Sequence, residues 1–163
     1  MDLGSVIIAL VLLALCIVPF IYYSGVQKKK KKNFSKELIN LAEQQNVKFS
    51  QYEVWSHYYG IGIDTSTNRL FYFKKREDKE QKAFIDLSEV EKCRVNNVNR
   101  MVNDNKIIDR LELVFKFRDS KMPEKALEFY NKEESMSLHE ELQLSEKWAN
   151  IINSNLKPAV SKP

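Results

Sequence analysis

The sequence is poor in the residues that build disulfide frameworks, metal sites and flexible linkers. It contains only two cysteines, Cys16 and Cys93, among 163 residues. They lie in different predicted environments, an apolar N-terminal segment and a polar domain, and their spacing is not that of a metal site. A disulfide-stabilised scaffold is therefore excluded, and a reducing compartment fits. Four glycines and four prolines are too few for a long disordered linker.

Catalytic motifs are also lacking. The chain has no G-x-S-x-G, Walker-type, H-E-x-x-H, C-x-x-C or dinucleotide-binding motif. One alternative is a small membrane-bound enzyme in which Cys93, His57 and an aspartate form a thiol triad. However, Cys93 alternates with Glu91 and Val95 in a predicted strand, which favours packing against a sheet. We therefore expect a non-catalytic protein without a cofactor or a small-molecule substrate.

An acidic stretch in the last third of the chain is a second candidate site. Glu133-Glu134 and His139-Glu140-Glu141 supply carboxylates and an imidazole that could hold a cation. A solvated loop before a helix explains them better, because carboxylates at a helix N-terminus interact favourably with the helix dipole. We expect no metal site.

A long uncharged run occupies the N-terminal end of the chain. Leu3 to Tyr23 contains 21 residues, and a helix of that length spans about 31 Å, close to the ~30 Å hydrocarbon core of a bilayer. It is followed by Lys28, Lys29, Lys30, Lys31 and Lys32. Only Asp2 and the terminal amine precede it. Because basic flanks stay in the cytoplasm, we predict a single span with its N-terminus outside and a cytoplasmic C-terminal domain.

Three other interpretations of this run fit less well. A cleaved signal peptide needs a basic start and a small-residue cleavage site, whereas Tyr22-Tyr23 and the lysines stand where cleavage would occur. Leu13-Ala14-Leu15-Cys16 distantly resembles a lipobox, but Leu15 is not small and further apolar residues follow. A buried helix of a globular domain is the third option, but a segment that is apolar on all faces suits lipid better.

The basic balance of the chain comes from the lysine tract alone. The chain has 26 basic and 22 acidic residues, and outside residues 1–33 it has 21 of each. A neutral domain lacks the basic stripe that nucleic-acid binding needs. We interpret the lysines as a topology signal with some attraction to anionic lipid, worth about 1 kcal/mol per lysine near the surface. A regulated lipid-headgroup site is the alternative.

The remaining length predicts one compact domain. We divide the chain into a transmembrane helix (3–23), a polybasic juxtamembrane segment (24–33), a short amphipathic helix with a connection (34–50), the domain (51–157) and a tail (158–163). In the short helix, Phe34, Leu38, Leu41 and Ala42 share one face, and Asn46 is a left-handed stop.

Strand-like periodicity follows in the domain. The expected strands are Tyr58 to Asp64, Arg69 to Lys75, Lys82 to Leu87 with a continuation from Val90 to Val95 past a bend near Ser88, Leu111 to Phe117, and Ala126 to Tyr130. Thr65 to Asn68 is the turn of a hairpin, and Asn96 to Lys106 is an Asn-rich connection. Leu111, Leu113 and Phe115 alternate with polar residues, so they predict a core face.

The C-terminal segment has helical periodicity. Its apolar stripe is formed by Leu144, Trp148, Ile151, Ile152 and Leu156. A tryptophan in the middle of such a stripe offers a large area for burial, so we expect Trp148 to fill the core. A groove for a partner is the alternative position for this side chain.

The order of these elements resembles the pleckstrin-homology-like fold, particularly its small bacterial versions. The resemblance covers about Tyr52 to Leu156 and depends on antiparallel strands that end in one helix with a central Trp148. Residues 62–73 resemble an early hairpin of such domains, and residues 83–90 resemble a later strand. The family implies a mainly β, bent antiparallel barrel or sandwich that the C-terminal helix closes.

One departure from this family bears on function. Its phosphoinositide-binding members carry basic residues around the first hairpin, whereas the loop from Asp64 to Asn68 has none. Lys74, Lys75 and Arg76 lie at the far end of the strand, close to acidic residues. We therefore expect a membrane-anchored interaction or scaffold domain that binds a protein or peptide partner. A lipid-headgroup-binding module is the alternative.

Overall fold

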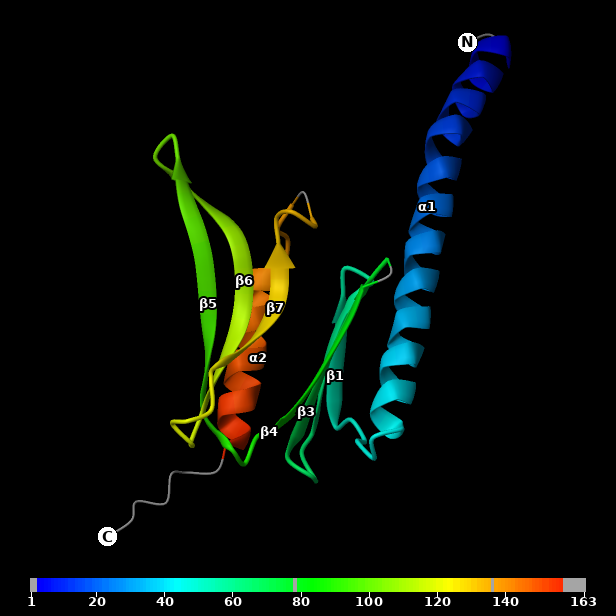
Figure 1. Ribbon diagram of the computed structural model, residues 1–163. Helices are drawn as coiled ribbons and strands as arrows, with labels where there is room; N and C mark the ends of the chain where they lie inside the picture. Colours follow the sequence, from blue (N-terminus) through cyan, green and yellow to red (C-terminus); the bar gives the residue numbers. More distant parts are fainter. Residues whose placement is uncertain (1–2, 78, 136, 157–163) are drawn as a thin grey trace.

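The computed structural model describes residues 3–77, 79–135 and 137–156 (Figure 1). The chain forms a long helix, two antiparallel sheets and a C-terminal helix. The elements are α1 (Leu3–Glu43), β1 (Gln51–Trp55), β2 (Tyr59–Asp64), β3 (Arg69–Arg76), β4 (Lys79–Asp86), β5 (Val90–Val102), β6 (Asn105–Phe117), β7 (Lys125–Asn131) and α2 (Glu141–Asn155). The predicted tail, residues 158–163, lies outside the described residues.

Helix α1 joins three segments that the sequence predicts separately. The apolar run, the lysine tract and the amphipathic segment form one helix of 41 residues. The lysines continue the helix because lysine has a good helix propensity and no proline follows Pro19 within it. Helix α1 ends at Glu43, and Asn46 has the expected left-handed backbone, with φ of 56°. The Val47 N–H donates to the Ala42 carbonyl at 3.0 Å, which satisfies one of the last carbonyls of the helix.

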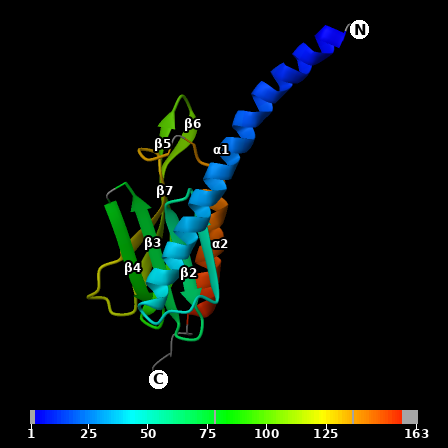
Figure 2. The ribbon, with the colours of Figure 1, turned by 90° about the vertical axis from the view of Figure 1, so that its right-hand side faces the viewer.

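The apolar part of α1 stands free of the domain. It is long and apolar enough to cross a membrane, and none of its most apolar window is buried in the protein. Figures 1 and 2 both show this part extending away from the sheets. The exposure excludes the interpretation as a buried core helix, because such a helix would be covered by other elements.

The first sheet has the strand order β1-β2-β3-β4. Its β2–β3 hairpin is the predicted one, with Asp64 paired to Arg69. The buried Asp64 carboxylate accepts hydrogen bonds from the N–H groups of Lys48, Ser66 and Thr67 at 3.1, 2.9 and 3.2 Å. These bonds hold the turn and the end of the α1–β1 connection together.

The second sheet has the order β5-β6-β7 and corrects one prediction. The segment from Asn96 to Lys106 is not an irregular connection. Strands β5 and β6 pair through it as far as Val102 and Asn105, and Asn103 and Asp104 form the turn with φ of 47° and 61°. The sequence does not reveal these strands because asparagine has low β-propensity and no alternating core face marks them.

The strand from Lys82 to Leu87 does not continue directly into the next one. Strand β4 ends at Asp86 and β5 begins at Val90, and the two belong to different sheets. Within the described residues no strand pair joins the two sheets, so the sheets do not close into a barrel. The coarser prediction, antiparallel sheets with a C-terminal helix across them, is confirmed.

Two hydrophobic cores hold the domain together. The larger one lies between the sheets and α2, and Trp148, Leu111, Leu113 and Phe115 are all 0% exposed within it. The smaller one packs α1 against the other face of the first sheet. Its buried residues are Phe34, Leu38, Ala42, Val47, Val54, Phe71 and Phe73. The first sheet is therefore covered on both faces.

Glycines on β2 let α1 approach the sheet closely. A Cβ added at Gly60 would lie 2.8 Å from a Leu38 methyl carbon, and one at Gly62 would lie 2.5 Å from the Phe49 ring. The Phe34 and Phe73 rings stack at 5.1 Å between centroids, and Lys75 forms an ion pair with Glu37. The C-terminal part of α1 is thus a packed element of the domain, which fixes the direction of its apolar part.

Candidate functional site

A groove runs along β1 between α1 and α2. It consists of two adjoining hollows of about 480 and 470 Å³ that share Lys31, Glu53 and Val54. The first is lined by Lys31, residues 53–58, Ser135, His139, Glu140, Glu141 and Leu144. The second is lined by Lys28, Lys31, Lys32, Ser35, Tyr52, Glu53 and Val54. We call these residues together the β1 groove.

Helix α1 forms the basic wall of the β1 groove. Lys28, Lys31, Lys32 and Ser35 have the spacing i, i+3, i+4 and i+7, which places them on one face of a helix. Among the described ion pairs, none involves a residue of the lysine tract. Tyr52 lies at the foot of this wall with 44% of its surface exposed. The lysine tract thus offers three cations to the groove, and Lys29 and Lys30 are not among its lining residues.

The opposite wall, formed by α2 and the loop before it, is acidic; Glu140 is exposed there, whereas the carboxylates of Glu53 on β1 and Glu141 on α2 are paired. Glu53 accepts hydrogen bonds from the Lys147 ammonium at 2.8 Å and from the Trp148 indole N–H at 3.1 Å. Glu141 is buried and accepts from the Ser56 hydroxyl at 3.3 Å and from the His139 backbone N–H at 2.7 Å. Both carboxylates therefore connect α2 to β1 and to the β1–β2 loop.

The β1–β2 loop closes one end of the groove in an unusual backbone conformation. Ser56 and His57 have φ of 48° and 60°, in the left-handed region that residues with a Cβ rarely adopt. The buried His57 Nδ1 has no hydrogen-bond partner among the described residues. Burial lowers the pKa of His57, and the nearby positive charges of Lys30 and Lys31 lower it further. His57 is therefore held as a neutral ring close to the lysine wall.

Strand β1 is an edge strand of the first sheet, and its residues line the β1 groove. An edge strand presents unpaired N–H and C=O groups to any further strand. The β5 edge is covered at Cys93, because the Asn153 side chain bonds both the N–H and the C=O of this residue, at 2.9 and 2.8 Å. On β7, Trp55 and Tyr72 donate to the carbonyls of Phe129 and Glu128 at 3.0 and 2.7 Å.

The remaining edge, β4, is exposed and charged. Lys79, Glu80 and Lys82 project from it, and Glu80 and Lys82 form an ion pair at 3.2 Å. Charged side chains on an edge strand oppose pairing with another chain. Strand β1 differs because it lies between two helices and carries Tyr52 and Val54.

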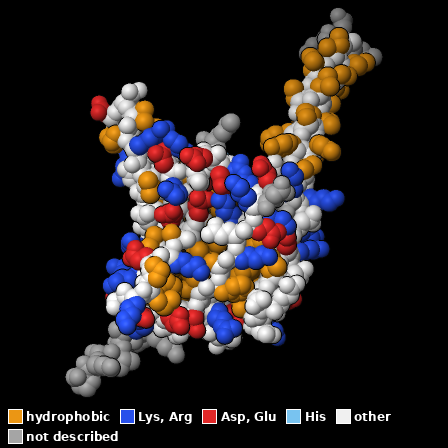
Figure 3. Space-filling view, viewed as in Figure 1, with side chains coloured by type: hydrophobic (Ala, Val, Ile, Leu, Met, Phe, Trp, Pro, Cys, Tyr) orange, Lys and Arg blue, Asp and Glu red, His pale blue; other side chains and the backbone are white. Residues whose placement is uncertain are grey.

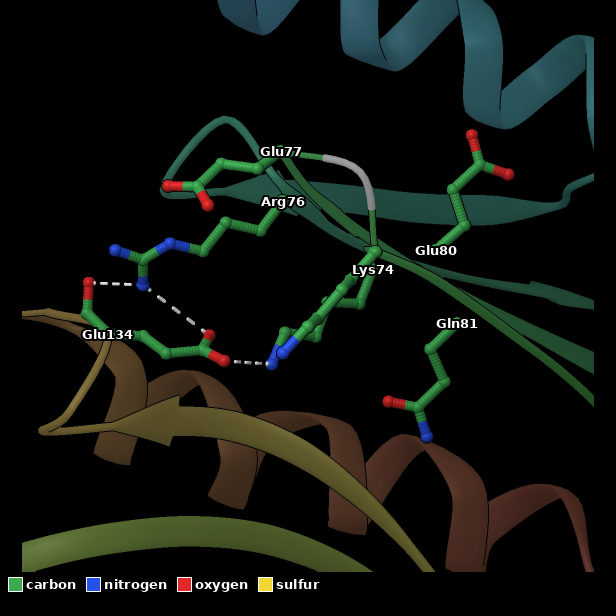
Figure 4. A pocket seen from close by; sticks show the side chains of 7 residues that line it. Lys74, Arg76, Glu77, Glu80, Gln81 and Glu134 are labelled. Atoms are coloured by element: carbon green, nitrogen blue, oxygen red, sulfur yellow. Dashed lines mark hydrogen bonds and ion pairs between the residues drawn. The ribbon is translucent and has the colours of Figure 1, made fainter.

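A separate hollow of about 360 Å³ lies between β3, β4 and the β7–α2 loop (Figure 4). The charges of Lys74, Arg76 and Glu134 in this hollow are already paired, whereas Glu77 and Lys79 at its rim form none of the described ion pairs. Lys74 contacts Glu128 and Glu134 at 2.6 and 2.8 Å, and Arg76 contacts the Glu134 backbone carbonyl and carboxylate. The Tyr59 hydroxyl donates to Glu128 at 2.8 Å. This network connects the first sheet to β7 and the loop after it.

The hydrogen bonds around Lys74 stabilise the charged form of its ammonium group. Burial by itself would lower the pKa of Lys74, but hydrogen bonds to Glu128 and Glu134 outweigh burial and raise it. Burial next to Glu128 also raises the pKa of Tyr59 far above its usual value. A network in which each charge has a partner joins the two sheets and leaves little charge for a ligand.

The residues of the hypothetical thiol triad lie in different places. Cys93 is buried on β5 next to α2, whereas His57 lies in the β1–β2 loop at the β1 groove. Burial raises the pKa of Cys93 to about 12, so it remains a thiol at neutral pH. In the parts of the chain that the structure describes, no group of three His, Cys, Asp or Glu side chains is arranged to hold a metal ion.

The sequence reasoning missed β1 and the groove beside it. The sequence predicts the lysines to be a membrane-surface tract, and three of them line this groove. A signal for β1 existed in Gln51–Trp55, where Tyr52 and Val54 alternate with polar residues before a turn. The structure also brings His57 and His139 to one hollow, although the sequence separates them widely.

Comparison of the chain with models of protein families, with curated proteins and with solved structures finds no match.

Proposed function

We propose that this protein is a single-pass, membrane-anchored docking module whose cytoplasmic domain binds an extended acidic peptide segment beside β1. The observation that carries the proposal is the β1 groove. It combines an open edge strand with a wall of lysines that have no carboxylate partner in the described part of the chain.

The anchoring part of the proposal is supported by the continuity of α1. The helix passes without interruption from the apolar run to the packed residues Phe34 and Leu38. A signal peptidase would have to cut within this helix, whereas a transmembrane anchor needs no cut. The lysines that follow the apolar run favour a cytoplasmic domain.

The peptide part of the proposal is supported by the chemistry of the groove. A peptide that adds to an edge strand gains affinity from main-chain hydrogen bonds and specificity from alternate side chains. Tyr52, with 44% of its surface exposed, offers an apolar contact beside this strand, whereas Val54 is buried against α1. Lys28, Lys31 and Lys32 attract carboxylates, and His57 is kept neutral by burial and by the neighbouring lysines. These features together favour an acidic strand over a basic one.

The scaffold part of the proposal keeps the resemblance to the pleckstrin-homology-like fold. Antiparallel strands followed by a helix with a buried central Trp148 support it, although the sheets are open. We infer a binding role without catalysis, because the buried thiol of Cys93 lies apart from both histidines, which line the β1 groove. The lysine wall also lies next to the predicted membrane surface, so that a docked segment would be held close to the bilayer.

The test is selection of peptides from a random display library on the full chain in lipid nanodiscs. We expect enrichment of acidic peptides with alternating apolar residues, and loss of their binding when alternate peptide amides are N-methylated. Lys31→Glu should weaken binding at least tenfold. Lys29→Glu is the matched control, since it changes the same charge in the same tract outside the groove and should have a much smaller effect.

Two results would contradict the proposal. One is enrichment of peptides without an acidic bias. The other is equal sensitivity of binding to Lys29→Glu and Lys31→Glu, which would mean that the tract acts only through its total charge. A loss of binding with Lys82→Glu but not with Lys31→Glu would move the docking strand to β4.

A further inference from the structure

Exposed apolar side chains outside α1 are concentrated at one place. Large hydrophobic residues with more than a third of their surface exposed are Tyr52, Phe84, Val98, Met101, Val102, Ile107 and Met122. Four of these seven belong to the outer part of the β5–β6 hairpin, and Met101 is the most exposed at 66%. Figure 3 shows hydrophobic and basic side chains together at this projecting end.

The outer hairpin projects beyond the rest of its sheet. Pairing between β6 and β7 begins at Arg110, and between Asn99 and Ile108 the strands β5 and β6 pair only with each other. The roughly five residues of β6 beyond β7 extend about 16 Å at ~3.3 Å per residue. The two-residue turn at Asn103 and Asp104 makes a compact tip. Among the described residues, no other strand pairs with this part of the sheet.

Neither face of the outer hairpin is purely polar. Arg100 pairs with Ile107 and Val102 pairs with Asn105, which places Val102 and Ile107 on one face. Met101 pairs with Lys106 on the other face. A hairpin in water usually has one polar and one buried face. Here each face combines exposed apolar atoms with one cation, a composition that suits the interface between water and anionic lipid.

The position of the hairpin relative to α1 identifies the surface that it meets. In Figures 1 and 2 the β5–β6 turn points toward the same end of the molecule as the N-terminus of α1. Helix α1 is packed on the first sheet through Leu38 and Phe34, so this direction is fixed. Between Tyr23 and Phe34 the helix rises about 16 Å toward that end, a length comparable to the projection of the hairpin.

We propose that the tip of the β5–β6 hairpin inserts Met101, Val102 and Ile107 into the headgroup region of the same bilayer that α1 crosses. The proposal rests on the membrane span of the proposed function and does not depend on the β1 groove. Lys106, which forms none of the described ion pairs, then meets a lipid phosphate, whereas Arg100 is already paired with Asp109 at 3.3 Å. The domain contacts the membrane at two separated points, which sets its tilt and holds the β1 groove at a constant height.

The test measures the depth of labels on the full chain in vesicles of phosphatidylcholine and phosphatidylglycerol. A nitroxide is attached to Met101→Cys in a Cys16→Ala background, since Cys93 is buried. We expect the Met101 label to be several times more accessible to oxygen than to a water-soluble nickel reagent. Met122→Cys is the matched control, because Met122 is 42% exposed in the β6–β7 loop and should show the opposite ratio.

Further labels separate the alternatives. A label at Phe20→Cys reports the span itself: a lipid signal at Phe20 with an aqueous signal at Met101 overturns the hairpin proposal and leaves the anchor intact. Protection of Met101 that appears in detergent and increases with protein concentration would also overturn it, since a second copy would then cover the tip. Val102→Asp with Ile107→Asp should return the Met101 label to water, and unchanged depth would contradict the proposal.

Discussion

Replacement of Trp148 by alanine tests how the domain is held together. Trp148 is 0% exposed in the core between the sheets and α2, and its indole N–H donates to Glu53 at 3.1 Å. Burial of an aromatic side chain of about 200 Å² at ~25 cal/mol per Å² corresponds to about 5 kcal/mol, of which alanine keeps a small part. Truncations of this kind cost about 3–5 kcal/mol.

The hydrogen bond contributes a smaller share of this loss. Glu53 keeps its ion pair with Lys147 at 2.8 Å after the substitution, so the carboxylate is not left without a partner. The net loss of such a bond is about 1 kcal/mol, or somewhat more when the acceptor is charged. Trp148→Phe isolates this share, because it keeps most of the apolar volume and removes the N–H.

The assay is thermal unfolding of the full chain in detergent micelles, followed by near-ultraviolet circular dichroism. For a domain of this size, a loss of 3–5 kcal/mol lowers Tm by about 10–20 °C, and Trp148→Phe should lower it by roughly a third of that. Since small domains have a total stability of about 5–15 kcal/mol, Trp148→Ala should be close to the limit of folding. A Tm within a few degrees of wild type would refute the burial of this side chain.

Two further predictions concern charge. Hydrogen bonds from Ser66, together with those from Lys48 and Thr67, hold the pKa of Asp64 well below its usual 3.8. The contribution of the Asp64 carboxylate to stability is therefore complete above pH 3.8 and is lost as the pH falls toward the lowered pKa. Asp64→Ala should lower Tm at neutral pH and flatten the acid side of the Tm–pH profile. An unchanged profile would contradict this prediction. For topology, a reporter active only in the cytoplasm should give a signal when fused after Pro163, and replacement of the five lysines by glutamine should mix the orientations. A signal only from a reporter active outside the cytoplasm would show that the orientation is reversed.

Helix α1 links these properties to function. Because it is continuous from the apolar run to Glu43, the apolar segment and the domain form one rigid unit. Gly60 and Gly62 allow Leu38 and Phe49 to pack close to β2. A flexible linker would let the domain rotate relative to the apolar segment, whereas this packing keeps both the β1 groove and the β5–β6 hairpin in fixed directions.

The sequence by itself determined the features that depend on local pattern. The apolar run from Leu3 to Tyr23, the β2–β3 hairpin, the core face of Leu111 to Phe117 and the buried Trp148 follow from hydrophobic periodicity and turn residues. Periodicity indicates which side chains avoid water, and it does so for each segment separately.

Only the tertiary structure decided which segments meet. Periodicity does not tell which strand remains at the edge of a sheet, so the open edge of β1 and its place between α1 and α2 were not foreseen. The outer part of the β5–β6 hairpin has no core face, and its pairing depends on backbone hydrogen bonds that leave no apolar pattern in the sequence. The helix propensity of the lysines explains why α1 is continuous, but its direction relative to the sheets is decided by the packing of its C-terminal part on β2, which involves contacts far away in the sequence.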